Sequence, residues 1–84
     1  MRYRILPTIE FSKDFKKLYN SIQKNMRKKI EEVAKDPTHY KHLHYDLAGS
    51  ARIRIGKYRV IFSYDVKKDE LYLEKIIPDH VYRK

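Results

Sequence analysis

Three arginines lie close together in the segment 52–62 and are the residues of this chain best suited to bind an anion. Arg52, Arg54 and Arg59 stand on either side of a glycine. A guanidinium carries a permanent charge and presents its N–H donors in a planar fork that matches phosphate oxygens. The same permanence excludes proton transfer, because the pKa of arginine stays above about 12 in proteins. The trio therefore suits phosphate binding and the stabilisation of negative charge, and acid–base chemistry must come from other residues.

The turn between these arginines predicts how they are positioned. Gly56-Lys57 reads as a two-residue turn, and a glycine at its first position supplies the positive φ of a type II′ hairpin. Such a turn fixes the register, so Arg54 should face Arg59, and Arg52 should face Ile61. Because side chains alternate along a strand, the three arginines share one face of the sheet, which we call the arginine face. The opposite face then carries the apolar residues Ile53, Ile55, Tyr58, Val60 and Phe62.

The pairing of two arginines is informative in itself. Like charges directly opposite each other destabilise a sheet, so the Arg54–Arg59 pair favours a face built to hold an anion. The alternative is a solvated face on which Glu74 partners the arginines, although one carboxylate cannot balance three of them.

The composition of the chain limits its class of function. The 84 residues include 20 basic and 11 acidic ones, and the formal charge of +9 indicates an acidic partner, either nucleic acid or protein. There is no cysteine, which excludes a disulfide framework and fits a reducing compartment. No apolar run is long enough to span a membrane, and the N-terminus lacks a signal-peptide core. We expect one domain, residues 1–84, located in the cytoplasm and independent of membranes.

The N-terminal half predicts one strand followed by two helices. Residues 3–9 form the strand, with Pro7 at an edge or near the strand's end, because proline cannot donate to a ladder. Ser12 is the predicted N-cap of the first helix and Ser21 that of the second. The second helix should end at Asp36-Pro37. Its predicted apolar stripe consists of Ile22, Met26, Ile30 and Val33.

The C-terminal half predicts three consecutive strands after a loop at residues 38–50. A turn with Lys67-Lys68 at its tip pairs Tyr64 with Leu71 and Phe62 with Leu73. Strict alternation then places Tyr72, Glu74 and Ile76 on the arginine face, and Pro78 ends the last strand. The order β-α-α-β-β-β predicts an α+β fold in which a helix hairpin packs on one face of a small, mostly antiparallel sheet.

The hairpin and its surroundings resemble a known family. Leu47-Ala48-Gly49 and the segment from Arg52 to Phe62 give the pattern G-x-x-R-x-R-x-G-x-Y-R, which is similar to the RelE/ParE superfamily of bacterial and archaeal toxins. The ending His80-Val81-Tyr82-Arg83 resembles the closing motif of that superfamily. Element order and length match over essentially the whole chain. The resemblance implies a RelE-like fold and, as partner, a cognate RelB-like antitoxin.

The resemblance implies one of two activities. RelE-type members cleave mRNA in the ribosomal A site without a metal, by attack of the 2′-hydroxyl, whereas ParE-type members inhibit DNA gyrase and lack the nuclease residues. Arg52, Arg54, Arg59 and Tyr82 match positions that RelE-like members use for cleavage. The segment 76–80 stands where those members carry a further arginine, and its His80 is similar to the His-Tyr ending of YoeB-like relatives.

The remaining candidate residues follow from this chemistry. The proton transfers are assigned to His80, whose pKa is near 6.5 when unperturbed, or to a tyrosine such as Tyr82. Tyr82 also suits stacking on a base. The predicted RNA contacts are Lys57, Arg83, Lys28 and Lys29. For the two helix lysines a solvated face is the simpler interpretation, and contact with RNA phosphates is the alternative. His42 and His44 lack a third ligand at recognised spacing, so neither a metal nor another cofactor is expected.

We therefore predict the toxin of a type II toxin–antitoxin system, acting as a metal-independent endoribonuclease on ribosome-bound mRNA and held inactive by its antitoxin. The alternatives are a ParE-like gyrase inhibitor without nuclease activity and a non-enzymatic nucleic-acid-binding module.

Overall fold

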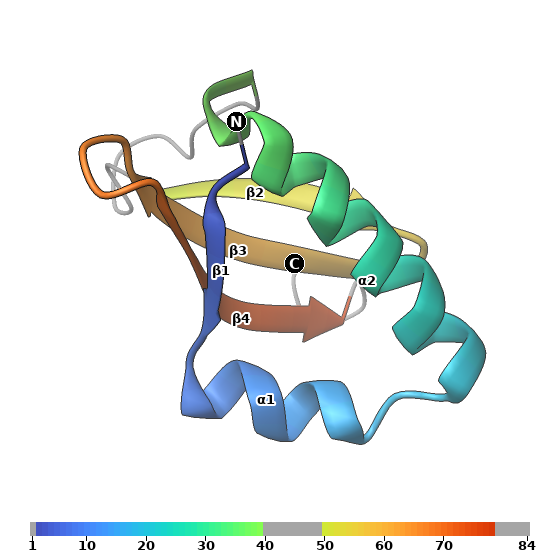
Figure 1. Cartoon of the computed structure of the whole chain (residues 1–84). Helices are drawn as coiled ribbons and strands as arrows, with labels where there is room; N and C mark the ends of the chain where they lie inside the picture. Colours follow the sequence, from blue (N-terminus) through green and yellow to red (C-terminus); the bar gives the residue numbers. More distant parts are fainter. Residues whose placement is uncertain (1, 40–49, 79–84) are drawn as a thin grey trace.

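Two helices lie against a four-stranded sheet in the computed structural model, which describes residues 2–39 and 50–78 (Figure 1). The elements are β1 (Arg4–Pro7), α1 (Ile9–Lys16), α2 (Asn20–Lys35), a 3₁₀ turn (Pro37–His39), β2 (Ser50–Ile55), β3 (Tyr58–Asp65) and β4 (Glu70–Pro78). The predicted α+β class and the order β-α-α-β-β-β are confirmed. Neither helix in this part of the chain is long and apolar enough to cross a membrane.

The sheet has the strand order β1-β4-β3-β2, so β4, the last strand in the described part of the chain, lies in its interior. β1 is an edge strand and runs parallel to β4, with Arg4 opposite Glu70 and Pro7 opposite Leu73. The other two pairs are antiparallel. Pro7 is the last residue of its edge strand, as predicted, so its missing N–H leaves no gap inside the sheet.

β4 contains one residue more than β3 can pair. Phe62 lies opposite Leu73 and Ile61 lies opposite Lys75, so the register shifts by one residue and leaves Glu74 in a β-bulge. Beyond the bulge Ile76 lies opposite Val60 and belongs to the buried core. The prediction that Ile76 lies on the arginine face was therefore wrong, because the bulge returns it to the helix side.

Both helices begin before the predicted positions, the first by four residues and the second by two. The hydroxyl of Thr8 accepts a hydrogen bond from the Phe11 N–H at 3.1 Å, so Thr8 and not Ser12 is the N-cap of α1. The second helix begins at Asn20, and its N-cap Tyr19 makes no side-chain capping bond, so Ser21 is a helical residue. α2 ends at Lys35, before Asp36-Pro37 as predicted.

A glutamine of α2 is hydrogen-bonded to the end of α1. The Nε2 atom of Gln23 donates to the carbonyls of Phe15 and Leu18, each at 3.0 Å. These carbonyls lie at the end of α1, where backbone acceptors lose their helical partners. One side chain of α2 therefore holds the end of α1, and both helices stay over the same face of the sheet.

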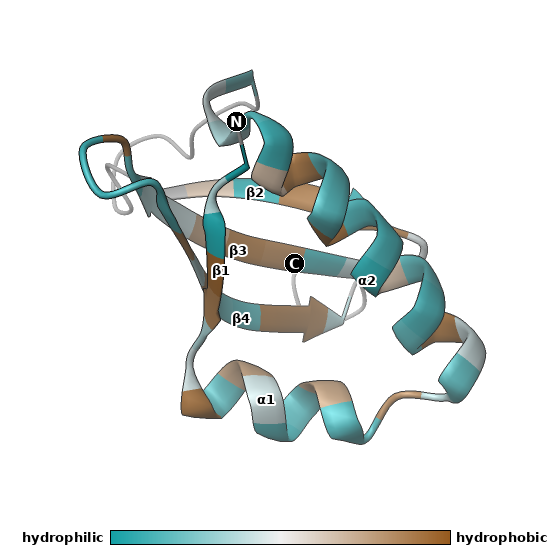
Figure 2. Cartoon of the chain, in the orientation of Figure 1, coloured by the Kyte–Doolittle hydropathy of each residue, from teal (hydrophilic) through white to brown (hydrophobic). Residues whose placement is uncertain are grey.

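The core lies between the helices and that sheet face, and in the view of Figure 2 hydrophobic stretches of β3 and β4 lie between α1 and α2. Phe62, Val60 and Leu71 from the sheet and Met26 and Val33 from α2 are its largest wholly buried apolar side chains. The apolar face predicted for the hairpin is confirmed, because its isoleucines and valine are buried with Phe62.

Candidate functional site

The hairpin that carries the arginines has the predicted register. Arg54 lies opposite Arg59, and Arg52 lies opposite Ile61. Gly56 has a φ of +59°, and among the described non-glycine residues only Asp69 has a positive φ, so the turn is of type II′. The three arginines consequently share the arginine face, which points away from the helices.

The three arginines differ in their surroundings. Arg52 and Arg54 are exposed on the edge strand β2, whereas Arg59 on β3 is half-buried and its Nε atom is shielded from solvent. The inner position restricts the conformations of Arg59, so its fork meets a ligand with less loss of side-chain entropy. The neighbour of Arg59 on β4 is Ile77.

A fourth cation joins this group because of the bulge. Lys75 pairs with Ile61, is exposed, and lies on the arginine face diagonal to Arg59. The diagonal neighbour expected from strict alternation was Glu74. Four positive charges therefore occupy the two residue rows nearest the Gly56 turn, and we call Arg52, Arg54, Arg59 and Lys75 the basic rows.

Glu74 stands beside the basic rows and is held from two sides. The hydroxyl of Ser63 donates to its carboxylate oxygen Oε2 at 2.6 Å, which places the side chain on the arginine face. Its backbone carbonyl accepts a hydrogen bond from the Thr8 hydroxyl at 3.1 Å. Thr8 thus caps α1 and ties the bulge to the start of that helix.

The other end of the arginine face is acidic. Glu70 forms an ion pair with Arg4 at 2.6 Å and accepts a hydrogen bond from the hydroxyl of Tyr72. The Tyr72 bond, assisted by Arg4, lowers the pKa of Glu70 below its usual value. The same bond, with burial, raises the pKa of Tyr72 to about 12. Tyr72 is therefore a hydrogen-bond donor to Glu70 over the physiological range and is unsuited to proton transfer.

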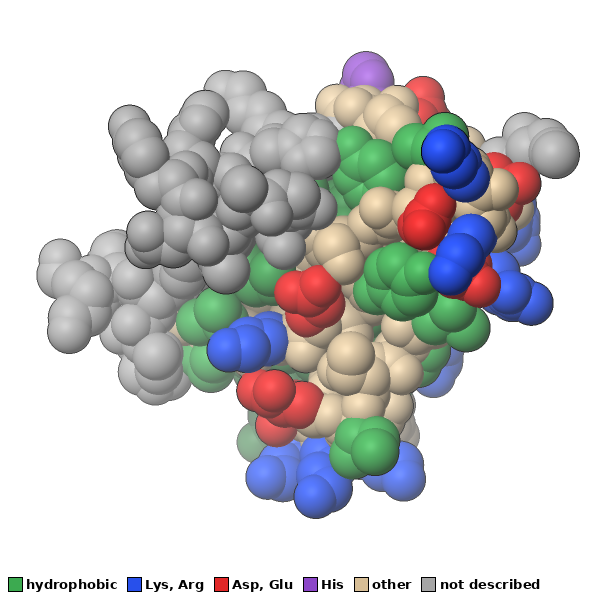
Figure 3. Space-filling view, turned by 90° about the vertical axis from the view of Figure 1, so that its left-hand side faces the viewer, with side chains coloured by type: hydrophobic (Ala, Val, Ile, Leu, Met, Phe, Trp, Pro, Cys, Tyr) green, Lys and Arg blue, Asp and Glu red, His purple; other side chains and the backbone are tan. Residues whose placement is uncertain are grey.

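The carboxylates at this end have structural partners. Oδ1 of Asp65 accepts the backbone N–H groups of Lys67 and Lys68 in the β3–β4 turn at 3.0 and 3.2 Å. Seen from the side of that turn, acidic and basic side chains are interspersed on the surface (Figure 3). The arginine face therefore changes from positive near Gly56 to mixed charge near the β3–β4 turn.

The other predicted site residues are spread over the molecule. Lys57 is exposed at the hairpin turn, beside a hollow of 480 Å³ between that turn and the start of α2. Lys28 and Lys29 lie on α2 and therefore on the opposite side of the sheet from the arginines. Lys29 also forms an ion pair with Glu32 at 3.4 Å. His80, Tyr82 and Arg83 lie outside the described residues, as do His42, His44 and the segment 47–49.

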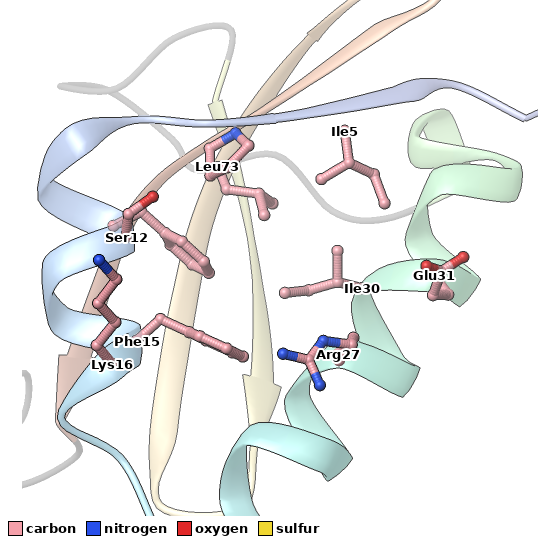
Figure 4. Close-up of a pocket in the computed structure, with 10 residues that line it drawn as sticks. Ile5, Ser12, Phe15, Lys16, Arg27, Ile30, Glu31 and Leu73 are labelled. Carbon is pink, nitrogen blue, oxygen red and sulfur yellow. The ribbon is translucent and has the colours of Figure 1, made fainter. Parts of the chain in front are cut away.

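A groove between the two helices had no counterpart in the sequence-based predictions. It has a volume of 360 Å³, and its floor is apolar, with Ile5, Phe11, Phe15, Ile30 and Leu73. Lys16, Arg27 and Glu31 also line it. The Arg27 guanidinium lies 5.3 Å from the centre of the Phe15 ring, and Figure 4 shows the two side chains pointing toward each other across the groove. In the described part of the chain no three potential metal ligands gather.

Comparison with known proteins identifies a family. The family model described as ParE toxin of type II toxin–antitoxin system, parDE, matches residues 5–78. A search of curated proteins finds no match.

Solved structures with the same fold include toxins and their complexes. The toxin–antitoxin complex RelBE2 from Mycobacterium tuberculosis contains a chain with a TM-score of 0.84 and 21% identity, covering 93% of this chain and 99% of that one. For the intact Escherichia coli RelBE complex the TM-score is 0.79 with 19% identity, covering 90% and 95%. A YoeB/ParE toxin from Agrobacterium tumefaciens has a TM-score of 0.77 with 14% identity, covering 89% and 96%. These similarities establish the RelE-like fold.

Proposed function

Because the chain belongs to the ParE toxin family of type II toxin–antitoxin systems, we propose that it acts on a nucleic acid through its arginine face, as a ribosome-dependent endoribonuclease that cleaves mRNA. The observation that carries this proposal is the concentration of Arg52, Arg54, Arg59 and Lys75 in the two rows beside the Gly56 turn. Cations arranged in this way on a sheet suit the phosphates of a single strand better than they suit a stable fold.

The proposed reaction needs charge stabilisation more than it needs a bound cofactor. The 2′-hydroxyl attacks the adjacent phosphorus, and negative charge accumulates on the phosphoryl oxygens while the bond to the 5′-oxygen breaks. The forks of Arg54 and Arg59 oppose each other across two strands, so a phosphate between them neutralises their repulsion and receives donors from both sides. His80 and Tyr82 remain our proposals for proton transfer to the leaving oxygen.

A cognate antitoxin is the proposed partner, and it is supported by the charge of the chain and by the helix groove. The net charge of +9 suits an acidic partner, and Lys16 and Arg27 beside the apolar floor suit an amphipathic segment that carries carboxylates. The similar structures from M. tuberculosis and E. coli are complexes of a toxin with its antitoxin.

A second candidate function is inhibition of DNA gyrase without nuclease activity. The matching family model is named for ParE, and the end of β4 carries Ile76, Ile77 and Pro78 where RelE-like members have an arginine. Both candidates use a positive surface, so the charge of the chain does not discriminate between them.

Two parallel assays test the proposal. Purified protein is added to a reconstituted translation reaction and the message is mapped by primer extension, while a second sample is added to gyrase with relaxed plasmid. We expect ribosome-dependent breaks in the message and unchanged supercoiling. Intact message together with blocked supercoiling would replace the proposed function with the second candidate, and binding without either effect would leave a nucleic-acid-binding module.

A further inference from the structure

Glu74 lies on the arginine face, as predicted, and the bulge places Lys75 beside it on that face, which strict alternation did not predict. It is the extra residue of the bulge in β4, an interior strand, and its half-buried side chain lies on the arginine face. Bulges are known devices for turning one side chain toward a functional site. The contacts from Ser63 to the carboxylate and from Thr8 to the carbonyl leave Glu74 little freedom to rotate.

A proton acceptor is the component that the basic rows lack. Arginine cannot accept a proton, and the 2′-hydroxyl must lose one for cleavage to proceed. Among the described residues the arginine face has three carboxylates. Glu70 is engaged by Arg4 and Tyr72, and Asp65 is engaged by amides of the far turn, so both are committed at the acidic end. Glu74 alone of the three adjoins the basic rows.

We propose that Glu74 is the general base of the reaction. This inference rests on the proposed endoribonuclease function. The Glu74 carboxylate takes the proton of the 2′-hydroxyl, the 2′-oxygen forms a bond to phosphorus, and the bond from phosphorus to the 5′-oxygen breaks. The products are a 2′,3′-cyclic phosphate and a 5′-hydroxyl, whose proton comes from a general acid on the protein or from water. No metal, oxidant or other co-reactant enters this balance.

The spacing of the strands agrees with this role. Neighbouring strands lie roughly 4.8 Å apart and residues advance roughly 3.4 Å along a strand, so the Cα atoms of Arg59 and Glu74 are about 10 Å apart. An arginine side chain reaching from one side and a glutamate from the other leave space between them for a phosphate and the adjoining ribose hydroxyl. Ser63 occupies one carboxylate oxygen, Oε2, and Oε1 is the oxygen assigned to the substrate.

The decisive variant is Glu74→Gln, which keeps the shape of the side chain and removes its ability to accept a proton. Single-turnover cleavage on programmed ribosomes should fall by about 10²–10⁴-fold. Binding of the variant to those ribosomes should stay equal or become tighter, because a negative charge beside the phosphate has been removed.

The sign of the effect separates this role from a purely electrostatic one. If Glu74 only weakened the positive field of the basic rows, Glu74→Gln would cleave faster than wild type. Glu10→Gln, an exposed change of equal charge at the start of α1, is the matched control and should cleave at the wild-type rate. Ser63→Ala should lower the rate at saturating ribosome, with a smaller loss than Glu74→Gln, because Ser63 positions the base without touching the substrate.

The outcomes also separate this inference from the proposed function. Wild-type protein that cleaves while Glu74→Gln cleaves equally well would overturn the role of Glu74 and leave the endoribonuclease standing. Wild-type protein that cleaves no message would overturn both. Thermal unfolding checks that each variant is folded, and where Glu74→Gln is not, Glu74→Asp carries the test: an undiminished rate for this shorter, retracted carboxylate would overturn the assignment.

Discussion

Replacing Arg59 by alanine should separate activity from stability. Arg59 is the half-buried member of the basic rows and shares the proposed phosphate with Arg54. Removing one preorganised donor to a charged transition state lowers rates by about 10²–10³-fold, which corresponds to roughly 2.7–4 kcal/mol. We expect a loss of this size for Arg59→Ala. Arg59→Lys should recover part of the rate, because a point charge replaces the bidentate fork.

The effect of Arg59→Ala on the free energy of unfolding should be small, because relief of charge repulsion opposes the loss of a partly buried side chain. Ile55 and Tyr58 flank the turn as a hydrogen-bonded pair, so Arg54 and Arg59 form the next, non-hydrogen-bonded pair, with Cα atoms about 4.5 Å apart. Two guanidinium charges about 6 Å apart in water repel by ~0.7 kcal/mol. Truncation also removes a partly buried stem, at about 0.8 kcal/mol per buried methylene. The free energy of unfolding should therefore change by no more than about 1 kcal/mol.

The assay compares Arg59→Ala with Arg2→Ala in ribosome-dependent cleavage and in urea unfolding. Arg2 pairs with Glu31 at 3.0 Å on the helix side, so both variants lose one positive charge and only one of them loses it from the arginine face. Arg2→Ala should cleave normally. Full activity of a folded Arg59→Ala protein would refute the binding of a phosphate between Arg54 and Arg59. Equal losses of activity in both variants would mean that only the net charge of the protein matters.

Three further predictions concern the fold around the site. Gly56→Ala should lower the free energy of unfolding by about 1–2 kcal/mol in a urea titration, because alanine is strained at positive φ. A Cβ at this position meets no atom within 4 Å, so backbone strain is the only cost. Gly56→Asn should be less damaging, because asparagine tolerates positive φ better than alanine does. Thr8→Ala should lower the free energy of unfolding by about 0.5–2 kcal/mol through the lost α1 cap, and Thr8→Ser should restore it. Because the fold holds the pKa of Glu70 below 4.5, wild type should lose stability as the pH falls below that value, and Tyr72→Phe, which removes the main cause, should flatten the fall in melting temperature between about pH 6 and pH 3.

The hairpin could be predicted from the sequence because its determinants are local. A glycine at the first position of a two-residue turn leaves one register for the strands, and that register fixed the faces of Ile53, Arg54 and Arg59. The pairing of β3 with β4 was also predicted correctly from the β3–β4 turn as far as Phe62 and Leu73, because the position of the turn sets the register.

Strict alternation along β4 does not predict the bulge, although the residues that it would bury argue against it. Continuing from Leu71 and Leu73, strict alternation would have put Lys75 in the core, where an unpaired ammonium is costly. The polar doublet Glu74-Lys75 before Ile76 was the available signal. The N-cap at Thr8 was missed because the predicted strand extends to Ile9, whereas β1 ends at Pro7 and Ile9 lies 78% exposed in the first turn of α1.

The interior position of β4 has a consequence for biosynthesis. A ribosome releases β1, both helices and the β2–β3 hairpin before residues 70–78, and β4 is the strand with which both β1 and β3 pair. An isolated two-stranded hairpin is at best marginally stable, so the arginines of the nascent chain lie on an unstable hairpin until β4 is available to pair with β3. Glu74 and Lys75 take their places beside the arginines only when β4 pairs with β3. The order of synthesis therefore keeps the chain without a complete arginine face for most of the time it spends attached to the ribosome that makes it.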